Sequence, residues 1–167
     1  MNTNTYAQRR KGGRTTARLH RMHDGDVLTR ALAGDVTDEA RTIMTREIKS
    51  AMSRFRSAAA GEFDALAQAI PGRCEGARRS ATTILREVAR ANGDAAALAA
   101  LMNEWMERAV QAERASDEAR ATRDATGKTW AQVEPVVGAC DAERANYATA
   151  SRMARLMRLM LMTGARA

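Results

Sequence analysis

Apolar residues recur along most of this chain at steps of three and four, the spacing of one face of an α-helix. The longest stripe starts after "GDVTDEART" and stops before "PGR" at 71–73, with steps of 4, 4, 3, 4, 4, 3 and 4. We therefore expect one helix from about residue 37 to 70, with Asp35 or Thr37 as its N-cap. The stripe consists of Met44, Ile48, Met52, Phe55, Ala59, Phe63, Leu66 and Ile70.

Two further helices follow in the middle of the chain. One fits residues 74–92 and stops at the dipeptide "NG", a typical helix C-terminus. The next is expected to begin at Asp94 as N-cap and to keep strict heptad spacing, with small residues in its second half. A seam of small residues favours the close approach of another helix. The heptad positions are Leu98, Met102, Trp105, Ala109, Ala112, Ser116 and Ala119.

The two ends of the chain also read as helical. A short helix is expected over about 16–33 with an interruption at "HDGD", and a long one over 129–162 that carries Pro135 in its first turn or as a kink. Because proline occurs only twice and Val and Ile are scarce, strands have little to be made from. The predicted fold class is all-α: an elongated bundle of about four long, Ala-rich helices with coiled-coil-like packing and a basic N-terminal arm.

The composition indicates that the apolar core of this helical fold is small. Alanine accounts for 36 residues, and Val, Ile, Leu, Met, Phe, Trp and Tyr together account for 37. Alanine is a strong helix former but buries little apolar surface per residue. Such helices often complete their burial against other chains, so we expect partner subunits and a homo-oligomer.

Charge is concentrated at the two ends. Residues 1–22 hold six basic residues and no acid, residues 23–143 hold 16 basic and 20 acidic residues, and residues 144–167 hold five arginines and no acid. The expected organisation is a basic arm over 1–22, a helical body over 23–143, and a basic amphipathic helix end over 144–167 that continues the body.

Candidate chemistry is sparse. "ATGKT" at 125–129 resembles the end of a phosphate-binding loop, but Thr122 occupies the first glycine position and no strand precedes it, so a turn between helices is the better interpretation. "HRMHDGD" at 20–26 contains metal-capable side chains, but the chain has no other histidine. Cys74 and Cys140 match no zinc spacing. We expect no catalytic residues, no metal site and no cofactor.

The N-terminal arm has the composition of a segment that contacts phosphate groups. It is rich in arginine, contains two adjacent glycines, and has Tyr6 as its one aromatic residue. Its partner is expected to be nucleic acid or an acidic protein neighbour; the alternative is a solubilising tail. The proposed contact residues are Arg9, Arg10, Lys11, Arg14, Arg18 and Arg21.

The C-terminal helix end is amphipathic, with an apolar arc of about 140° at the helical 100° per residue. It is rich in methionine, whose flexible side chain adapts to different surfaces. The arc can close the chain's own bundle, dock on a partner, or lodge in a membrane surface. The residues predicted to dock a partner are Met153, Leu156, Met157, Met160 and Leu161.

No apolar segment reaches the roughly 18 residues of a membrane span and no hydrophobic leader is visible, so the expected location is the cytoplasm or the inside of an assembled particle. These features favour a non-enzymatic structural or assembly subunit of a large nucleic-acid-containing particle, with an internal, connector or tail-associated component of a bacteriophage virion as the leading hypothesis. Two alternatives stay open: a DNA-binding packaging or regulatory factor, and a membrane-active protein delivered from a particle.

Overall fold

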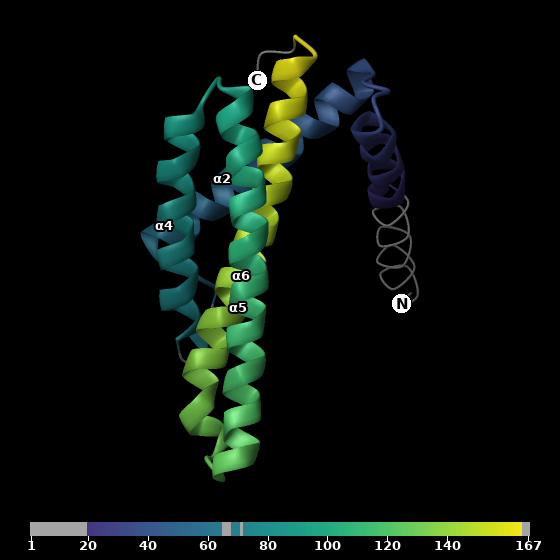
Figure 1. Ribbon diagram of the computed structural model, residues 1–167. Helices are drawn as coiled ribbons and strands as arrows, with labels where there is room; N and C mark the ends of the chain where they lie inside the picture. Colours follow the sequence, from purple (N-terminus) through teal and green to yellow (C-terminus); the bar gives the residue numbers. More distant parts are fainter. Residues whose placement is uncertain (1–19, 65–67, 71, 165–167) are drawn as a thin grey trace, which may run out of the picture. The chain divides into compact units, whose positions relative to one another are not determined.

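The computed structural model describes residues 20–64, 68–70 and 72–164, and within these ranges the chain is helical with no strand. This confirms the all-α prediction. The principal helices are α2 (Asp38–Ala60), α4 (Arg73–Ala91), α5 (Ala95–Thr126) and α6 (Trp130–Met162), and residues 20–32 form another helical segment (Figure 1).

The chain divides into two compact units, Met1–Arg46 and Glu47–Ala167. The division falls inside α2. The boundary expected between residues 22 and 23 falls within the helical segment 20–32, and the one expected between 143 and 144 falls inside α6, which is continuous there; the division into an arm, a body and a basic helix end stays a prediction.

In the first unit, the expected interruption at "HDGD" is absent, because residues 20–32 form one uninterrupted helix. Two side chains of this sequence make ion pairs with α2. His23 Nε2 lies 2.9 Å from Glu39 Oε1, and Asp24 Oδ2 lies 2.5 Å from Arg46 Nη2. Gly25 keeps a helical backbone, and its carbonyl accepts a hydrogen bond from the Thr29 hydroxyl. A single glycine weakens a helix by only about 1 kcal/mol, which neighbouring contacts can offset.

Helix α2 begins as expected and ends ten residues early. The Thr37 hydroxyl accepts a hydrogen bond from the amide of Ala40, so Thr37 is the N-cap. At the other end the amides of Gly61 and Glu62 donate to the carbonyls of Ala58 and Ser57, which is the Schellman arrangement, with Gly61 at a φ of 78°. The expected continuation to residue 70 is therefore wrong: the apolar spacing continues past a glycine that ends the helix.

The start of α5 and the end of α4 agree with the expected cap at Asp94 and the expected stop at "NG". Asp94 accepts hydrogen bonds from the amides of Ala96 and Ala97 at the start of α5. Thr129 and Gln132 form a capping box at the start of α6, and Pro135 lies inside this helix. Asn92 and Gly93 follow the end of α4.

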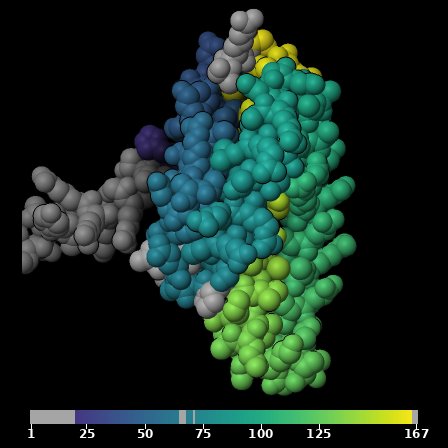
Figure 2. Space-filling view, turned by 90° about the vertical axis from the view of Figure 1, so that its left-hand side faces the viewer, coloured from purple at the N-terminus to yellow at the C-terminus, as the bar shows by residue number. Residues whose placement is uncertain are grey.

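In the second unit, α4, α5 and α6 pack on one another, and α5 and α6 run antiparallel along most of their length (Figure 1). At one end the paired α5 and α6 project beyond α4, which is visible in both views (Figures 1 and 2). The buried side of α5 follows the heptad prediction, whereas Met102 and Ala119 are half-buried. The buried positions are Leu98, Trp105, Ala109, Ala112 and Ser116.

Helices α4 and α6 meet at glycines. A Cβ atom placed on Gly76 would lie 2.5 Å from the carbonyl oxygen of Ala139, and one on Gly72 would lie 2.1 Å from the carbonyl oxygen of Pro135. Both distances are shorter than any ordinary van der Waals contact. The backbones therefore touch directly, and only glycine fits at these two positions.

A buried polar cluster joins α4, α5 and α6. The indole N–H of Trp105, whose side chain is fully buried, donates to the Glu87 carboxylate at 2.5 Å. Arg108 donates to the same carboxylate at 3.1 Å and to the Tyr147 hydroxyl at 3.3 Å. Burial alone would lower the pKa of Arg108. The hydrogen bonds of Arg108 to Tyr147 and Glu104, together with the negative charge of Glu87, have a larger effect and raise its pKa. Arg108 is therefore permanently charged.

The glycine contact leads to a prediction about stability. We expect Gly76→Ala to lower the free energy of unfolding by about 1–3 kcal/mol, because the added methyl group forces α4 away from α6. Gly25→Ala is the control, since no atom lies within 4 Å of a Cβ built there. The control should be neutral or stabilising by up to about 1 kcal/mol. Urea unfolding followed by circular dichroism measures both, and equal effects would contradict the close α4–α6 contact.

A second prediction concerns the polar cluster. We expect Glu87→Ala to destabilise the protein by about 1–3 kcal/mol, because the Trp105 N–H and Arg108 lose an acceptor in a buried place. Glu104→Ala is the matched control, since it removes the other carboxylate on Arg108 but leaves the bond to Trp105 intact. In a Trp130→Phe background the emission of Trp105 should shift in the first variant only. An unchanged emission in both would contradict the bond between Trp105 and Glu87.

Candidate functional site: a polar cleft lined by α2, α4 and α6

Most of the predicted arm residues lie outside the described residues. Arg9, Arg10, Lys11, Arg14 and Arg18 belong to the segment 1–19, and the structure places only Arg21, which is exposed in the first turn of the described helical segment 20–32. The structure leaves the phosphate-contact prediction for the arm untested.

The predicted docking residues of the C-terminal helix end lie largely in the chain's own interior. Met153, Leu156 and Met160 are each 2% exposed. Met157 and Leu161 are half-buried. This burial favours the alternative in which the apolar arc closes the chain's own bundle, and docking on a partner stays a prediction.

The two sequences considered for nucleotide and metal binding have structural roles. Thr122 lies within α5, which ends at Thr126, and Gly127 adopts a left-handed φ of 66° before α6 begins. "ATGKT" is therefore a turn between two helices, as predicted. Across the described ranges, no three His, Cys, Asp or Glu side chains gather as metal ligands. Nor is any helix of those ranges both long and apolar enough to cross a bilayer.

The thiol groups are poorly suited to nucleophilic attack. Cys74 and Cys140 are half-buried and form no disulfide. Burial raises the pKa of the Cys140 thiol, and the nearby charges of Glu143 and Asp141 raise it further. A raised pKa keeps this thiol protonated at neutral pH, whereas the thiolate is the reactive form.

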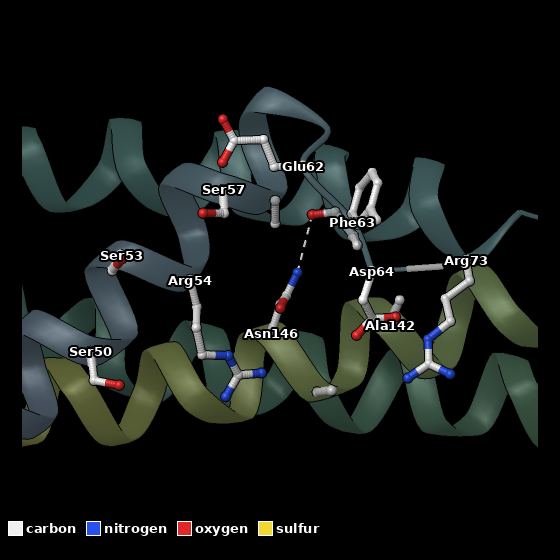
Figure 3. A pocket seen from close by; sticks show the side chains of 13 residues that line it. Ser50, Ser53, Arg54, Ser57, Glu62, Phe63, Asp64, Arg73, Ala142 and Asn146 are labelled. Carbon is white, nitrogen blue, oxygen red and sulfur yellow. Dashed lines mark hydrogen bonds between the residues drawn. The ribbon is translucent and has the colours of Figure 1, made fainter. Parts of the chain in front are cut away.

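The second unit contains a cleft of about 560 Å³ that sequence analysis did not identify. Its walls come from the C-terminal half of α2, the segment that follows it, the start of α4 and the middle of α6 (Figure 3). Its surface is mixed, with hydroxyl, guanidinium and carboxylate groups around a small apolar floor. The lining residues that carry functional groups are Ser50, Ser53, Arg54, Ser57, Glu62, Phe63, Asp64, Arg73 and Asn146.

Helix α2 presents its serines to the cleft because of their spacing. Ser50, Ser53 and Ser57 follow steps of three and four, so they share one side of the helix. Ile48 and Phe55 occupy the opposite side and are buried. The cleft-facing side of α2 thus carries three short polar side chains together with Arg54.

Two arginines reach the cleft from different helices. Arg54 extends from α2 toward α6, and Arg73 extends from the first position of α4 (Figure 3). Their guanidinium groups lie on either side of Asn146 in this view. The cleft therefore has two cationic groups that the fold brings together from positions 19 residues apart.

Asn146 forms part of the cleft floor and joins α6 to α4. Its side-chain amide donates to the Ser80 hydroxyl at 2.8 Å and to the Ala77 carbonyl at 3.1 Å. The Ser80 hydroxyl in turn donates to the Gly76 carbonyl at 2.9 Å. This chain of hydrogen bonds begins at the glycine contact and holds the floor of the cleft in place.

The sequence contained one signal for this site. The segment "SAMSRFRS" at 50–57 has three serines and two arginines on a helix whose other side is apolar. Serine is a weak helix former, so its repetition at helical spacing is unusual. Arg73 had no comparable signal, because its place at the cleft depends on the turn after α2.

The chain matches no family model, no curated protein and no solved structure.

A prediction follows from the burial of the C-terminal apolar arc. Met160 is 2% exposed and Met162 is 63% exposed, although both lie at the end of α6. We expect Met160→Asp to destabilise the protein by about 2–5 kcal/mol, because it removes a buried side chain and introduces a charge in its place. Met162→Asp should change the free energy of unfolding by less than about 0.5 kcal/mol. Urea unfolding distinguishes the two, and a mild effect of Met160→Asp would restore this face as a free docking surface.

Proposed function

We propose that this chain is a non-enzymatic structural or assembly subunit of a large nucleic-acid-containing particle. The leading candidate is a bacteriophage virion, in which the chain is an internal, connector or tail-associated component. The observation that carries the proposal is the charge distribution: both ends are strongly basic, and the body between them has four more acidic than basic residues. Two basic ends on a mildly acidic body suit a subunit that contacts nucleic acid without coating it uniformly.

The long helices support a role in assembly. Helices α5 and α6 contain 32 and 33 residues, so each is about 50 Å long. We propose that they pack in a coiled-coil-like manner within an elongated bundle of about four helices, because Ala109, Ala112 and Ser116 continue the heptad seam. Small residues at such a seam allow close approach but bury little surface, which favours further burial against neighbouring subunits.

Exposed apolar residues indicate where neighbours can bind. Trp130 and Val136, near the start of α6, are 43% and 52% exposed. On α5, Met106 and Val110 are one turn apart and are also exposed. Other copies of this chain or different subunits of the particle are the proposed partners for these side chains.

Each of the two alternative functions would depend on one of the two basic ends of the chain. A DNA-binding packaging or regulatory factor would use the arm in the same way but would act without assembling. A membrane-active protein would need the apolar arc of the C-terminal helix, and the burial of Met153, Leu156 and Met160 works against this alternative.

The test measures binding of the full chain to duplex DNA over a series of salt concentrations. We expect a variant with Arg9, Arg10, Lys11, Arg14 and Arg18 all replaced by Gln to bind more weakly. If each of these residues neutralises one phosphate, the plot of log K against log salt should become shallower by about 4.5.

The control replaces five basic residues elsewhere, so that the net charge changes equally. Suitable positions are exposed arginines that make no ion pair within the described ranges: Arg30, Arg56, Arg86, Arg90 and Arg114. We expect the control variant to keep most of the slope. Equal losses in the two variants would mean that total charge, and not the arm, drives binding, and would contradict the proposed contact.

A further inference from the structure

The serine hydroxyls of the cleft differ from most hydroxyls in the other helices. Within the described part of the chain, the side-chain hydroxyls of Ser50, Ser53 and Ser57 make no hydrogen bond. A hydroxyl in a helix commonly donates to the carbonyl four residues earlier, which satisfies its proton. Hydroxyls that do so within the described ranges include those of Thr29, Thr42, Ser80, Thr82, Thr83, Thr126, Thr149 and Thr163. The cleft serines therefore keep their donors available for a ligand.

The two arginines of the cleft are likewise uncommitted. Neither Arg54 nor Arg73 makes a side-chain hydrogen bond or ion pair with any residue that the structure describes. On the same helices some arginines are paired, for example Arg79 with Glu75 and Glu143, whereas Arg56, Arg86 and Arg90 are exposed without an ion pair; Arg54 and Arg73 differ from these three because they line a cleft. A guanidinium group presents N–H donors in a planar fork that matches two oxygens of a phosphate.

Two carboxylates, those of Glu62 and Asp64, also line the cleft. The Glu62 carboxylate points away from the guanidinium group of Arg54 (Figure 3). An anion in the cleft is thus favoured by the two guanidinium groups that line it.

The size and the remaining walls indicate what the anion is attached to. A volume of about 560 Å³ is several times larger than one phosphate requires, and it lies in the range of pockets that hold whole small molecules. Phe63 lines the cleft and is half-buried, so its ring can stack against a nucleobase. Both hydrogen bonds of the Asn146 side chain use its amide nitrogen, which leaves its carbonyl oxygen to accept from a ligand.

We infer that the cleft binds a nucleotide, with the phosphate held by Arg54, Arg73 and the α2 serines and the base placed against Phe63. The nucleotide is either a unit of a nucleic-acid strand or a free nucleotide, which share this chemistry. The inference deepens the proposed contact with nucleic acid. It uses residues separate from the arm, so either proposal can fail without the other.

The experiment titrates the full chain with adenosine monophosphate and follows amide chemical shifts by NMR. We expect saturable shifts at Ser50, Ser53 and Ser57, and an affinity lowered about tenfold or more by Arg54→Gln or Arg73→Gln, because each loses a charge-assisted hydrogen bond. Glu62→Gln should tighten binding modestly, since it removes one negative charge from the lining of the cleft. Arg86→Gln is the matched control: Arg86 is exposed on α4, does not line the cleft, and should not affect binding.

A second titration distinguishes the two sources. The arm-neutralised variant is titrated with single-stranded oligothymidylate, so that arm contacts do not mask the cleft. If the oligonucleotide competes with adenosine monophosphate, and Arg54→Gln abolishes this competition, the result would support a nucleic-acid strand as the ligand of the cleft. If the two do not compete, the result would support a free nucleotide as the ligand. No shifts at the cleft serines, or equal affinities of Arg54→Gln and Arg86→Gln, would overturn the inference. Inorganic phosphate binding as tightly as adenosine monophosphate would overturn the base contact with Phe63.

Discussion

The second unit depends on the direct backbone contact between α4 and α6 at Gly72 and Gly76. This chain is rich in alanine, so it cannot stabilise its interior mainly through large side chains. Close approach of the helix backbones supplies the packing contacts that large side chains would otherwise make. Bringing two helix backbones together increases the number of dispersion contacts per residue and also brings polar groups within bonding distance. The hydrogen bonds from Asn146 to Ser80 and Ala77 are a consequence of this approach.

The cleft is a further consequence of the same contact. Ala77, Ala142 and Ala145 line it with Asn146, and their small side chains leave space between α2 and the α4–α6 pair. Larger residues at these positions would fill the cleft and increase the apolar core. The alanine content that makes the core thin therefore also produces the hollow in which serine and arginine side chains meet.

Much of the helical framework could be predicted because its signals are local. Thr37, Asp94 and Thr129 cap helices through their own side chains, and the heptad spacing of α5 identified its buried side. The end of α2 was missed because the left-handed glycine at 61 interrupted a stripe whose spacing continued. The cleft was missed for a different reason: only tertiary packing places Arg54 and Arg73 in the lining of one cleft, and each alone resembles an ordinary surface arginine. The arm residues carry a clear compositional signal, but the contact they make depends on a partner.

Pro135 has one more effect on the behaviour of this fold. A proline inside a helix cannot donate to the carbonyl of the residue four positions earlier, which here is Ala131, an exposed residue. The beginning of α6 therefore has one backbone hydrogen bond fewer than the rest of the helix, between Ala131 and the point where Pro135 meets the start of α4. Local opening should cost less free energy there than in the part packed on α4, so this end of the helical pair can exchange its amide protons and rearrange while the remainder stays folded.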